Sequence, residues 1–167
     1  MPRWENRPVE IANLLNPAFC AVLLQDTLKA YVEINNFGMS YPLMFVVLPV
    51  VLHKATRNKF PKTTQTTLSE WLQSHSDIRL AFVERTRQLV PYTKEALIFG
   101  FQQGIFLLDE NNENGYILPT KKDLASLPSW SKNSEPFDCR EKAKFTGRWF
   151  AQTGDASTIY KTFGIRP

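Results

Sequence analysis

The side chains of this chain that most readily do covalent chemistry belong to two cysteines and two histidines: Cys20, Cys139, His53 and His75. A thiol becomes a nucleophile when an imidazole lies within hydrogen-bond reach, and the two residues need not be close in the sequence. Cys20 with His53 is the pair that could do so. The simpler interpretation is that Cys20 fills a helix face and that His53 ends an apolar segment. We therefore predict no catalytic residue and no enzymatic activity.

No spacing of these residues indicates a metal or cofactor site. The sequence has no Cys-x-x-Cys or His-Glu-x-x-His motif, and it lacks both glycine-rich phosphate-binding loops, Gly-x-x-x-x-Gly-Lys-Ser/Thr and Gly-x-Gly-x-x-Gly. We expect no cofactor in this chain. The two distant cysteines indicate reduced thiols, and the first residues form no apolar signal segment. These features predict a cytoplasmic protein.

Length and composition predict one domain with a substantial core. A chain of 167 residues, 43% of them hydrophobic and 13% aromatic, buries roughly 68–70% of its unfolded surface without disulfides or metals. We expect three parts within this domain, residues 1–61, 62–119 and 120–167. The net charge of +4 and the pI of about 9.1 are compatible with nucleic acid as a partner but do not diagnose it.

The elements that must position any site surround a central apolar run. Every residue from Leu43 to Leu52 is apolar, with Pro49 inside the run. A segment without a polar face must be covered on all sides, and these residues are too few to cross a membrane. We predict a buried helix that is kinked or restarted at Pro49. A strand is the alternative for residues 43–48, because the run is rich in valine.

Basic residues follow this run from Lys54 to Lys62, and two further basic stretches cover residues 79–87 and 121–148. Such runs are typical of a solvated surface, but they can also bind DNA or an acidic protein surface. The basic candidate contacts are Lys54, Arg57, Lys59, Lys62 and Arg148. Aromatic anchors dominate many interfaces, so Trp149 and Tyr160 are candidate partner contacts too, with core packing as an equal alternative.

Capping signals predict where the helices begin and end. Asn16-Pro17 begins a helix that runs to Ile34 and closes at Gly38, and Thr67–Glu70 is a capping box. Another helix is predicted to begin at Pro8, after Asn6 or Arg7, with Ile11, Leu14 and Leu15 at helical spacing. A further helix follows Ser76-Asp77, and the next begins at Pro91 or Thr93 and ends at Gly104. One more helix starts at Pro136, and the last runs from Asp155 to Gly164. Pro91 is expected to stop the helix before it.

Two short apolar runs, 105–108 and 116–119, flank an Asn-Gly turn signal and predict a β-hairpin. Three helices followed by a hairpin are typical of a winged-helix unit. The fold class is therefore predicted as mostly α with a small β-hairpin (α+β), a helical bundle that contains a winged-helix-like unit. Asp109, Glu110 and Glu113 near the hairpin tip would be repelled by phosphates, which favours protein docking over groove reading.

Five short blocks occur in order along nearly the whole chain: Asn16–Cys20, Gly38–Leu43, Leu48–Arg57, Pro91–Leu97 and Gly147–Phe150. Together they resemble the middle component of bacterial three-component ABC-ATPase defence systems of the Lamassu type. The resemblance implies a small accessory subunit of an antiphage or antiplasmid complex, which joins an SMC-like ATPase that senses DNA to an effector, often a nuclease. ATP and metal would belong to those partner subunits, and DNA would be reached through the complex. The alternative function is a free-standing winged-helix DNA-binding regulator.

Overall fold

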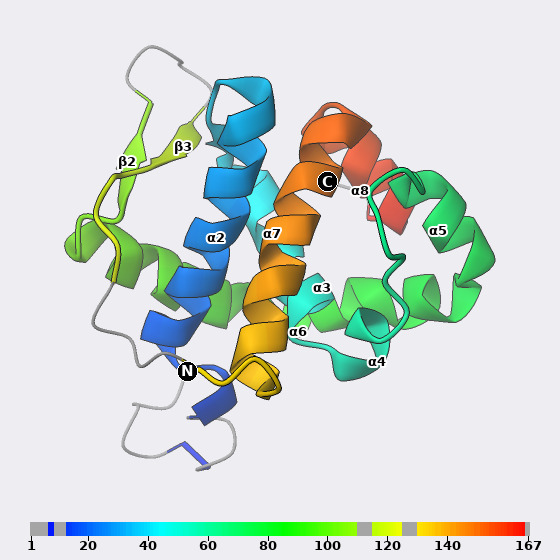
Figure 1. Cartoon of the computed structure of the whole chain (residues 1–167), viewed down its shortest axis with the longest axis horizontal. Coiled ribbons are helices and arrows are strands. Elements are labelled where there is room, and N and C mark those ends of the chain that lie inside the picture. Colours follow the sequence, from blue (N-terminus) through cyan, green and yellow to red (C-terminus); the bar gives the residue numbers. More distant parts are fainter. Residues whose placement is uncertain (1–6, 9–12, 110–114, 125–129, 166–167) are drawn as a thin grey trace.

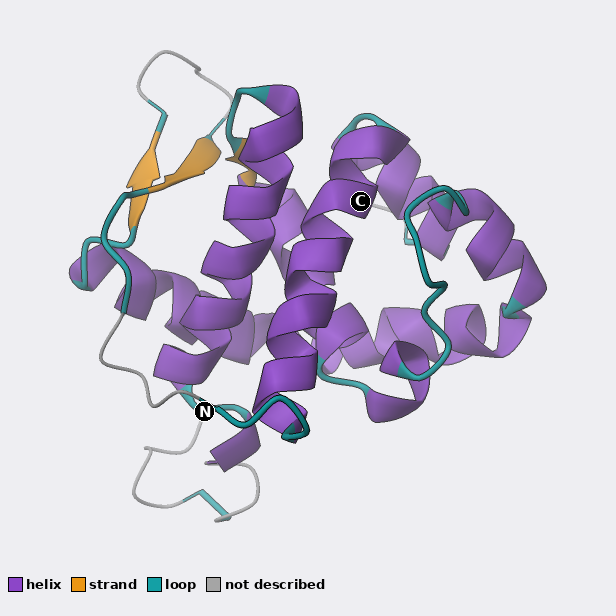
Figure 2. Cartoon of the chain, viewed as in Figure 1, coloured by secondary structure: helices purple, strands orange, loops and turns teal. Residues whose placement is uncertain are grey.

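The computed structural model describes residues 7–8, 13–109, 115–124 and 130–165, and helices make up most of it (Figures 1 and 2). In chain order the elements are α2 (Pro17–Asn35), β1 (Met39–Ser40), the 3₁₀ helix η2 (Tyr41–Leu43), α3 (Met44–Val51), α4 (Lys54–Arg57), α5 (Leu68–Ser74), α6 (Ser76–Gln102), β2 (Phe106–Leu108), β3 (Tyr116–Pro119), α7 (Glu135–Thr153) and α8 (Ala156–Phe163). The predicted class, mostly α with a small β element, is confirmed.

Helices α2 and α7 lie side by side, and α6 passes behind them (Figure 1). Their close approach depends on Gly147, since a Cβ built there would lie 2.2 Å from the carbonyl oxygen of Thr27. Ala30 is the next nearest neighbour, at 3.0 Å. A backbone without a side chain at this point lets the two helices touch, and most of the core packs around this pair.

The central apolar run forms η2 and α3, so the predicted helix is confirmed and the strand alternative for 43–48 is not found. All residues from Val46 to Val51 are buried. Pro49 lies inside α3, and the helix does not restart there. It ends two residues later, so the hydrogen bond that Pro49 cannot donate is lost in the last turn of the helix, where little structure depends on it.

Local capping accounts for most helix starts. The Asn16 side chain accepts a hydrogen bond from the Ala18 N–H (2.9 Å), Thr67 and Glu70 form the capping box, and Asp155 caps α8. The end of α2 was predicted to within one residue, but its left-handed cap was assigned to the wrong residue. Asn36, with φ of 58°, provides the left-handed cap of α2, whereas Gly38 lies where a Cβ would be 2.7 Å from the carbonyl oxygen of Ile117. Part of the helix predicted to begin at Pro8 lies outside the described residues.

Helix α6 contradicts the predicted break at Pro91, because it is continuous from Ser76 to Gln102. An interior proline costs about 3 kcal/mol in a helix. Buried residues on both sides of Pro91, such as Phe82 and Leu97, hold the two halves in one line against the core, and the proline itself is exposed. Only α5 and α6 therefore precede the hairpin within 62–119, and the predicted order of three helices there is wrong.

The hairpin is confirmed, and a third strand joins it. The antiparallel order is β1-β3-β2, with Met39 opposite Ile117 and Leu107 opposite Leu118. Strand β1 was not predicted, because two residues leave no periodic signal. The Phe106 ring packs on Gly100 and so fixes the hairpin to α6. Glu110 and Glu113 of the predicted acidic tip lie outside the described residues.

Candidate functional site

Arg57 was predicted as a surface contact, but the structure buries it, with 1% of the side chain exposed. Its guanidinium donates to the carboxylates of Asp138 (2.9 Å) and Glu135 (2.5 Å) at the start of α7. It also donates to the carbonyl oxygens of Val51 (2.9 Å) and Leu52 (2.8 Å), where α3 ends and leaves carbonyls without helical partners. Arg57 is thus a structural clamp between α3, α4 and α7, and it is not available to a partner.

Trp149 is also inside, with 1% of its surface exposed. Its indole N–H donates to the carbonyl oxygen of Thr66 (2.7 Å), and its ring packs against Trp71 and Phe60 at centroid distances of 5.0 and 5.5 Å. Of the two interpretations left open for Trp149, core packing is the one that this geometry supports.

These contacts hold the segment 58–67, between α4 and α5, along α7. The Trp71 indole donates to the carbonyl oxygen of Lys59 (2.6 Å), and Phe60 lies 5.3 Å from the ring of Phe145. The ammonium of Lys142 lies 5.3 Å from the centre of the Phe60 ring. The basic stretches 54–62 and 121–148 of the sequence therefore meet in space.

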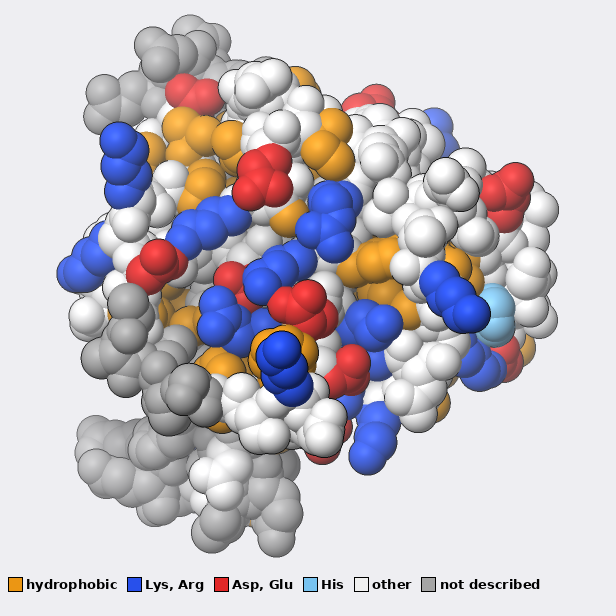
Figure 3. All heavy atoms as spheres, viewed as in Figure 1, with side chains coloured by type: hydrophobic (Ala, Val, Ile, Leu, Met, Phe, Trp, Pro, Cys, Tyr) orange, Lys and Arg blue, Asp and Glu red, His pale blue; other side chains and the backbone are white. Residues whose placement is uncertain are grey.

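Helix α7 adds a basic ridge to this surface. Arg140, Lys144 and Arg148 recur every fourth residue, which places them on one side of the helix. Figure 3 shows Lys and Arg side chains gathered over α2, α7 and the segment that follows α4.

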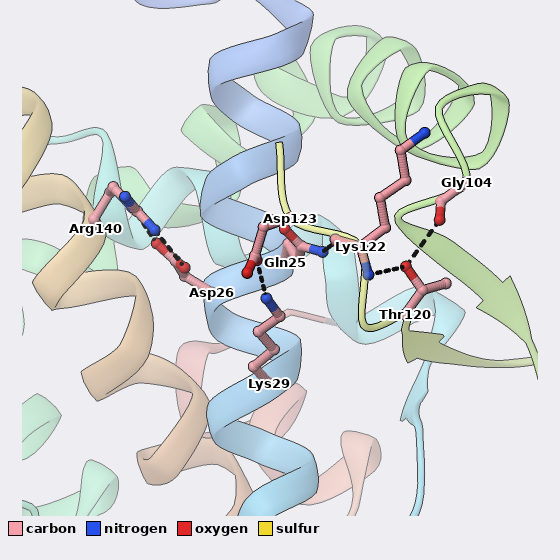
Figure 4. A network of polar contacts seen from close by, with 8 residues as sticks. All are labelled: Gln25, Asp26, Lys29, Gly104, Thr120, Lys122, Asp123 and Arg140. Carbon is pink, nitrogen blue, oxygen red and sulfur yellow. Dashed lines mark hydrogen bonds and ion pairs between the residues drawn. The ribbon is translucent and has the colours of Figure 1, made fainter. Parts of the chain in front are cut away.

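Most carboxylates of this region already have partners. Asp26, largely buried on α2, accepts two hydrogen bonds from Arg140 (2.6 and 3.0 Å), and this contact raises the pKa of the Arg140 guanidinium (Figure 4). Asp123 pairs with Lys29, and Glu141 pairs with Lys144. Glu135 and Asp138 are held by Arg57. Their negative charge is therefore offset at short range.

The same network fastens the segment 120–124 to α2 and to the turn that follows α6 (Figure 4). The Gln25 amide donates to the carbonyl oxygen of Lys122 (2.7 Å), and the Thr120 hydroxyl donates to that of Gly104 (2.8 Å). A polar pocket of about 360 Å³ lies beside these contacts, with Asp26, Lys29, Asp123 and Arg140 in its wall. Since its charges are paired with one another, the pocket offers no free charge to a ligand.

On α4, the segment 58–67 and α7, all within the described ranges, four cations make no ion pair: Lys54, Lys62, Lys142 and Arg148. We call these four residues the basic face. Lys54 and Lys62 are exposed, and Lys142 and Arg148 are half-buried. The predicted contact Lys59 differs from them, since it is bound to Asp77 (2.5 Å).

Tyr160 lies elsewhere, on α8, in the wall of an apolar groove of about 290 Å³. Its neighbours there are Tyr41, Pro42, Phe45, Val46, Thr86 and Ile165. Burial raises the pKa of the Tyr160 hydroxyl to about 12. Sequence reasoning missed this groove, because its walls come from three distant segments and no periodicity relates them.

The residues considered for covalent chemistry are not arranged for it. Cys20 is fully buried, and burial raises the pKa of its thiol to about 12; the pKa of Cys139 is raised to about 11 for the same reason. The imidazole Nδ1 of His53 lies 2.7 Å from the Thr56 hydroxyl and caps α4. A thiol that stays protonated at neutral pH is a poor nucleophile.

Within the described ranges, no cluster of three His, Cys, Asp or Glu side chains could hold a metal ion. The helices in the described part of the chain include none that is long and apolar enough to span a membrane.

Comparison with known protein families identifies a family for this chain. Residues 4–167 match the family model described as ABC-three component (ABC-3C) system Middle Component 3. Searches of curated proteins and of solved structures gave no significant match. The matched range covers nearly the whole chain, including every helix and strand described above. The chain therefore belongs to the family of Middle Component 3 of the ABC-three component systems.

Proposed function

We propose that this chain is a non-catalytic adaptor that docks on an SMC-like ABC ATPase of its system and links it to an effector, often a nuclease, in Lamassu-type defence. The observation that carries the proposal is the family match over residues 4–167, since a middle component is one part of an assembly. The buried, protonated thiols of Cys20 and Cys139 support a role that depends on binding rather than on chemistry.

Tyr160 is the proposed aromatic contact to the ATPase. Its ring lines an apolar groove, and an aromatic side chain of this kind is a common anchor in protein interfaces. Replacing it removes apolar contact area from the groove wall without changing charge.

The test is affinity purification of the tagged chain after co-expression with the other components of its system. We expect the ATPase to be recovered with the wild-type chain and to be lost with Tyr160→Ala, while circular dichroism shows that the variant is folded. Thr158→Ala, an exposed position on the same helix, is the matched control and should keep the ATPase. Failure of the wild-type chain to recover the ATPase would overturn the proposal.

The alternative, a free-standing winged-helix DNA-binding regulator, has one observation in its favour. Helix α6 leads directly into the hairpin, and the strand order β1-β3-β2 is compatible with a winged-helix arrangement. The exposed positions at the end of α6 are Lys94, Ile98 and Gln102. One cation beside an isoleucine that is 57% exposed is a poor match to phosphates, so this surface fits a protein partner better. The regulator predicts specific duplex binding that is lost on Lys94→Glu.

A further inference from the structure

We propose that the basic face, Lys54, Lys62, Lys142 and Arg148, binds the phosphate backbone of double-stranded nucleic acid without reading its sequence. This inference goes beyond the proposed function and does not depend on it, because it concerns the isolated chain.

Positive charge is in local excess at the basic face. On α7 the three carboxylates, Glu135, Asp138 and Glu141, are each bound to a cation of this chain. The four cations of the basic face have no carboxylate within ion-pair distance in the part of the chain that the structure describes. Their charge is therefore available to an outside anion. Cations that neutralise the phosphates of a duplex release its condensed counterions, and this release favours binding.

Contacts within the chain fix the backbone under the basic face before any ligand arrives. The indole N–H groups of Trp71 and Trp149 tie the segment 58–67 to its neighbours at Lys59 and Thr66. The Arg57 clamp holds α4 against the start of α7. A preformed arrangement loses little conformational entropy on binding. Helix α7 is 19 residues long, about 28 Å, so its length is comparable to about eight base pairs of duplex.

The surroundings of the basic face favour one kind of partner. The major groove admits a single protruding helix, whereas α7 is flanked by α2 and by the segment 58–67 (Figure 1). Contacts to the outer phosphates are therefore favoured over base edges. Single strands are bound by stacking on exposed aromatic rings, but Trp71 and Trp149 are buried. A complex with an acidic protein would be expected to have an apolar interface core. Here the ammonium of Lys142 lies over the Phe60 ring, so this ring is covered by a charged group.

The test uses the full chain and two fluorescein-labelled 24-base-pair DNA duplexes of unrelated sequence, with binding measured by fluorescence anisotropy at 50 and 200 mM NaCl. We expect both duplexes to bind with the same Kd within about twofold. With about four phosphates neutralised, binding should weaken about a hundredfold between the two salt concentrations. A preference of more than tenfold for one duplex would overturn the claim of sequence independence.

A pair of matched variants locates the site. Lys62→Glu/Arg148→Glu reverses two charges of the basic face, and Lys94→Glu/Lys161→Glu reverses two exposed charges on α6 and α8. Both variants change the net charge equally. We expect the first to lose at least tenfold in affinity and the second to stay within about threefold. Equal losses would show a general charge effect and would overturn the proposal.

A third probe separates nucleic acid from an acidic protein surface. If the duplex does not bind at 50 mM NaCl while poly-glutamate binds and is lost in Lys62→Glu/Arg148→Glu, the basic face recognises acidic polypeptide and the proposal is wrong. Thermal unfolding of each variant, matched to the wild type, confirms that the loss reflects binding.

Discussion

The guanidinium of Arg57 lies 2.9 Å from the carboxylate of Asp138 (Nε to Oδ2), and this contact joins residues 81 positions apart. Together with the bonds to Glu135 and to the carbonyls that end α3, it holds the central apolar helix, α4 and α7 in one arrangement. A residue that the sequence places in a basic run thus works as part of the core.

Replacing Arg57 with alanine should destabilise the fold markedly. The change leaves two carboxylates and two carbonyls without their donor, and we expect a loss of about 2–4 kcal/mol in the free energy of unfolding, since the carboxylates remain half-exposed. Urea unfolding followed by tryptophan fluorescence measures it. Lys54→Ala, three residues earlier on an exposed position, is the control and should change stability by less than about 0.5 kcal/mol. Similar values for both variants would contradict the clamp.

Gly147→Ala should separate α2 from α7. The new methyl group would lie 2.2 Å from the Thr27 carbonyl oxygen, so the helices must move apart, at a cost of about 3 kcal/mol. The control is Gly104→Ala, where the added methyl meets open space and the positive φ alone costs about 1 kcal/mol. Chemical denaturation of both variants gives the comparison. A Gly147→Ala protein as stable as the wild type would show that the helices do not pack this closely.

The two thiols should be unreactive in the folded protein. With the pKa of Cys20 raised to about 12, roughly one thiol in ten thousand is ionised at pH 8, and the side chain is out of contact with solvent. We expect a thiol reagent such as 5,5′-dithiobis(2-nitrobenzoic acid) to label both cysteines only on unfolding. Rapid labelling of Cys20 at native conditions, or loss of defence activity in a folded Cys20→Ala variant, would instead support a nucleophilic role.

Stability should fall in mild acid. The pKa values of Glu70, Asp77 and Asp155 are lowered by their hydrogen bonds to Thr67, Lys59 and Thr158, respectively. A carboxylate whose pKa is lower in the folded state stabilises fully above its unfolded pKa, and this contribution disappears as the pH falls through the folded value. We therefore expect the urea midpoint to decrease as the pH drops below about 5.

The control for this pH effect is Glu70→Gln/Asp155→Asn, since amide side chains can still cap both helices but do not titrate there. The variant should show a weaker pH dependence between pH 5 and 3 than the wild type. An unchanged pH dependence would mean that other carboxylates produce it.

Local signals in the sequence were sufficient for much of the fold. Asn16, Thr67 and Asp155 cap helices through hydrogen bonds to residues two or three positions away, so their role can be recognised from neighbouring residues. The break predicted at Pro91 was wrong because packing of α6 against the core outweighs the local cost of proline. Strand β1 escaped prediction because its partner, β3, lies more than seventy residues away.

The candidate site was also predicted only in part from the sequence. The basic stretches were visible in the sequence. That two of them lie close together in space was not, because this depends on contacts such as Phe60 with Phe145 and Thr66 with Trp149. The burial of Arg57 was equally hidden, since its acidic partners lie 78 and 81 positions along the chain. A charged residue can be assigned to the surface only when the residues around it are known.

The most direct test of the adaptor role is whether this chain bridges its partners. Tagged ATPase is purified from cells that express the effector with and without this chain, and the recovered effector is quantified by mass spectrometry. We expect the effector to be recovered with the ATPase only when this chain is present. Equal recovery of the effector without this chain would contradict the proposed adaptor role.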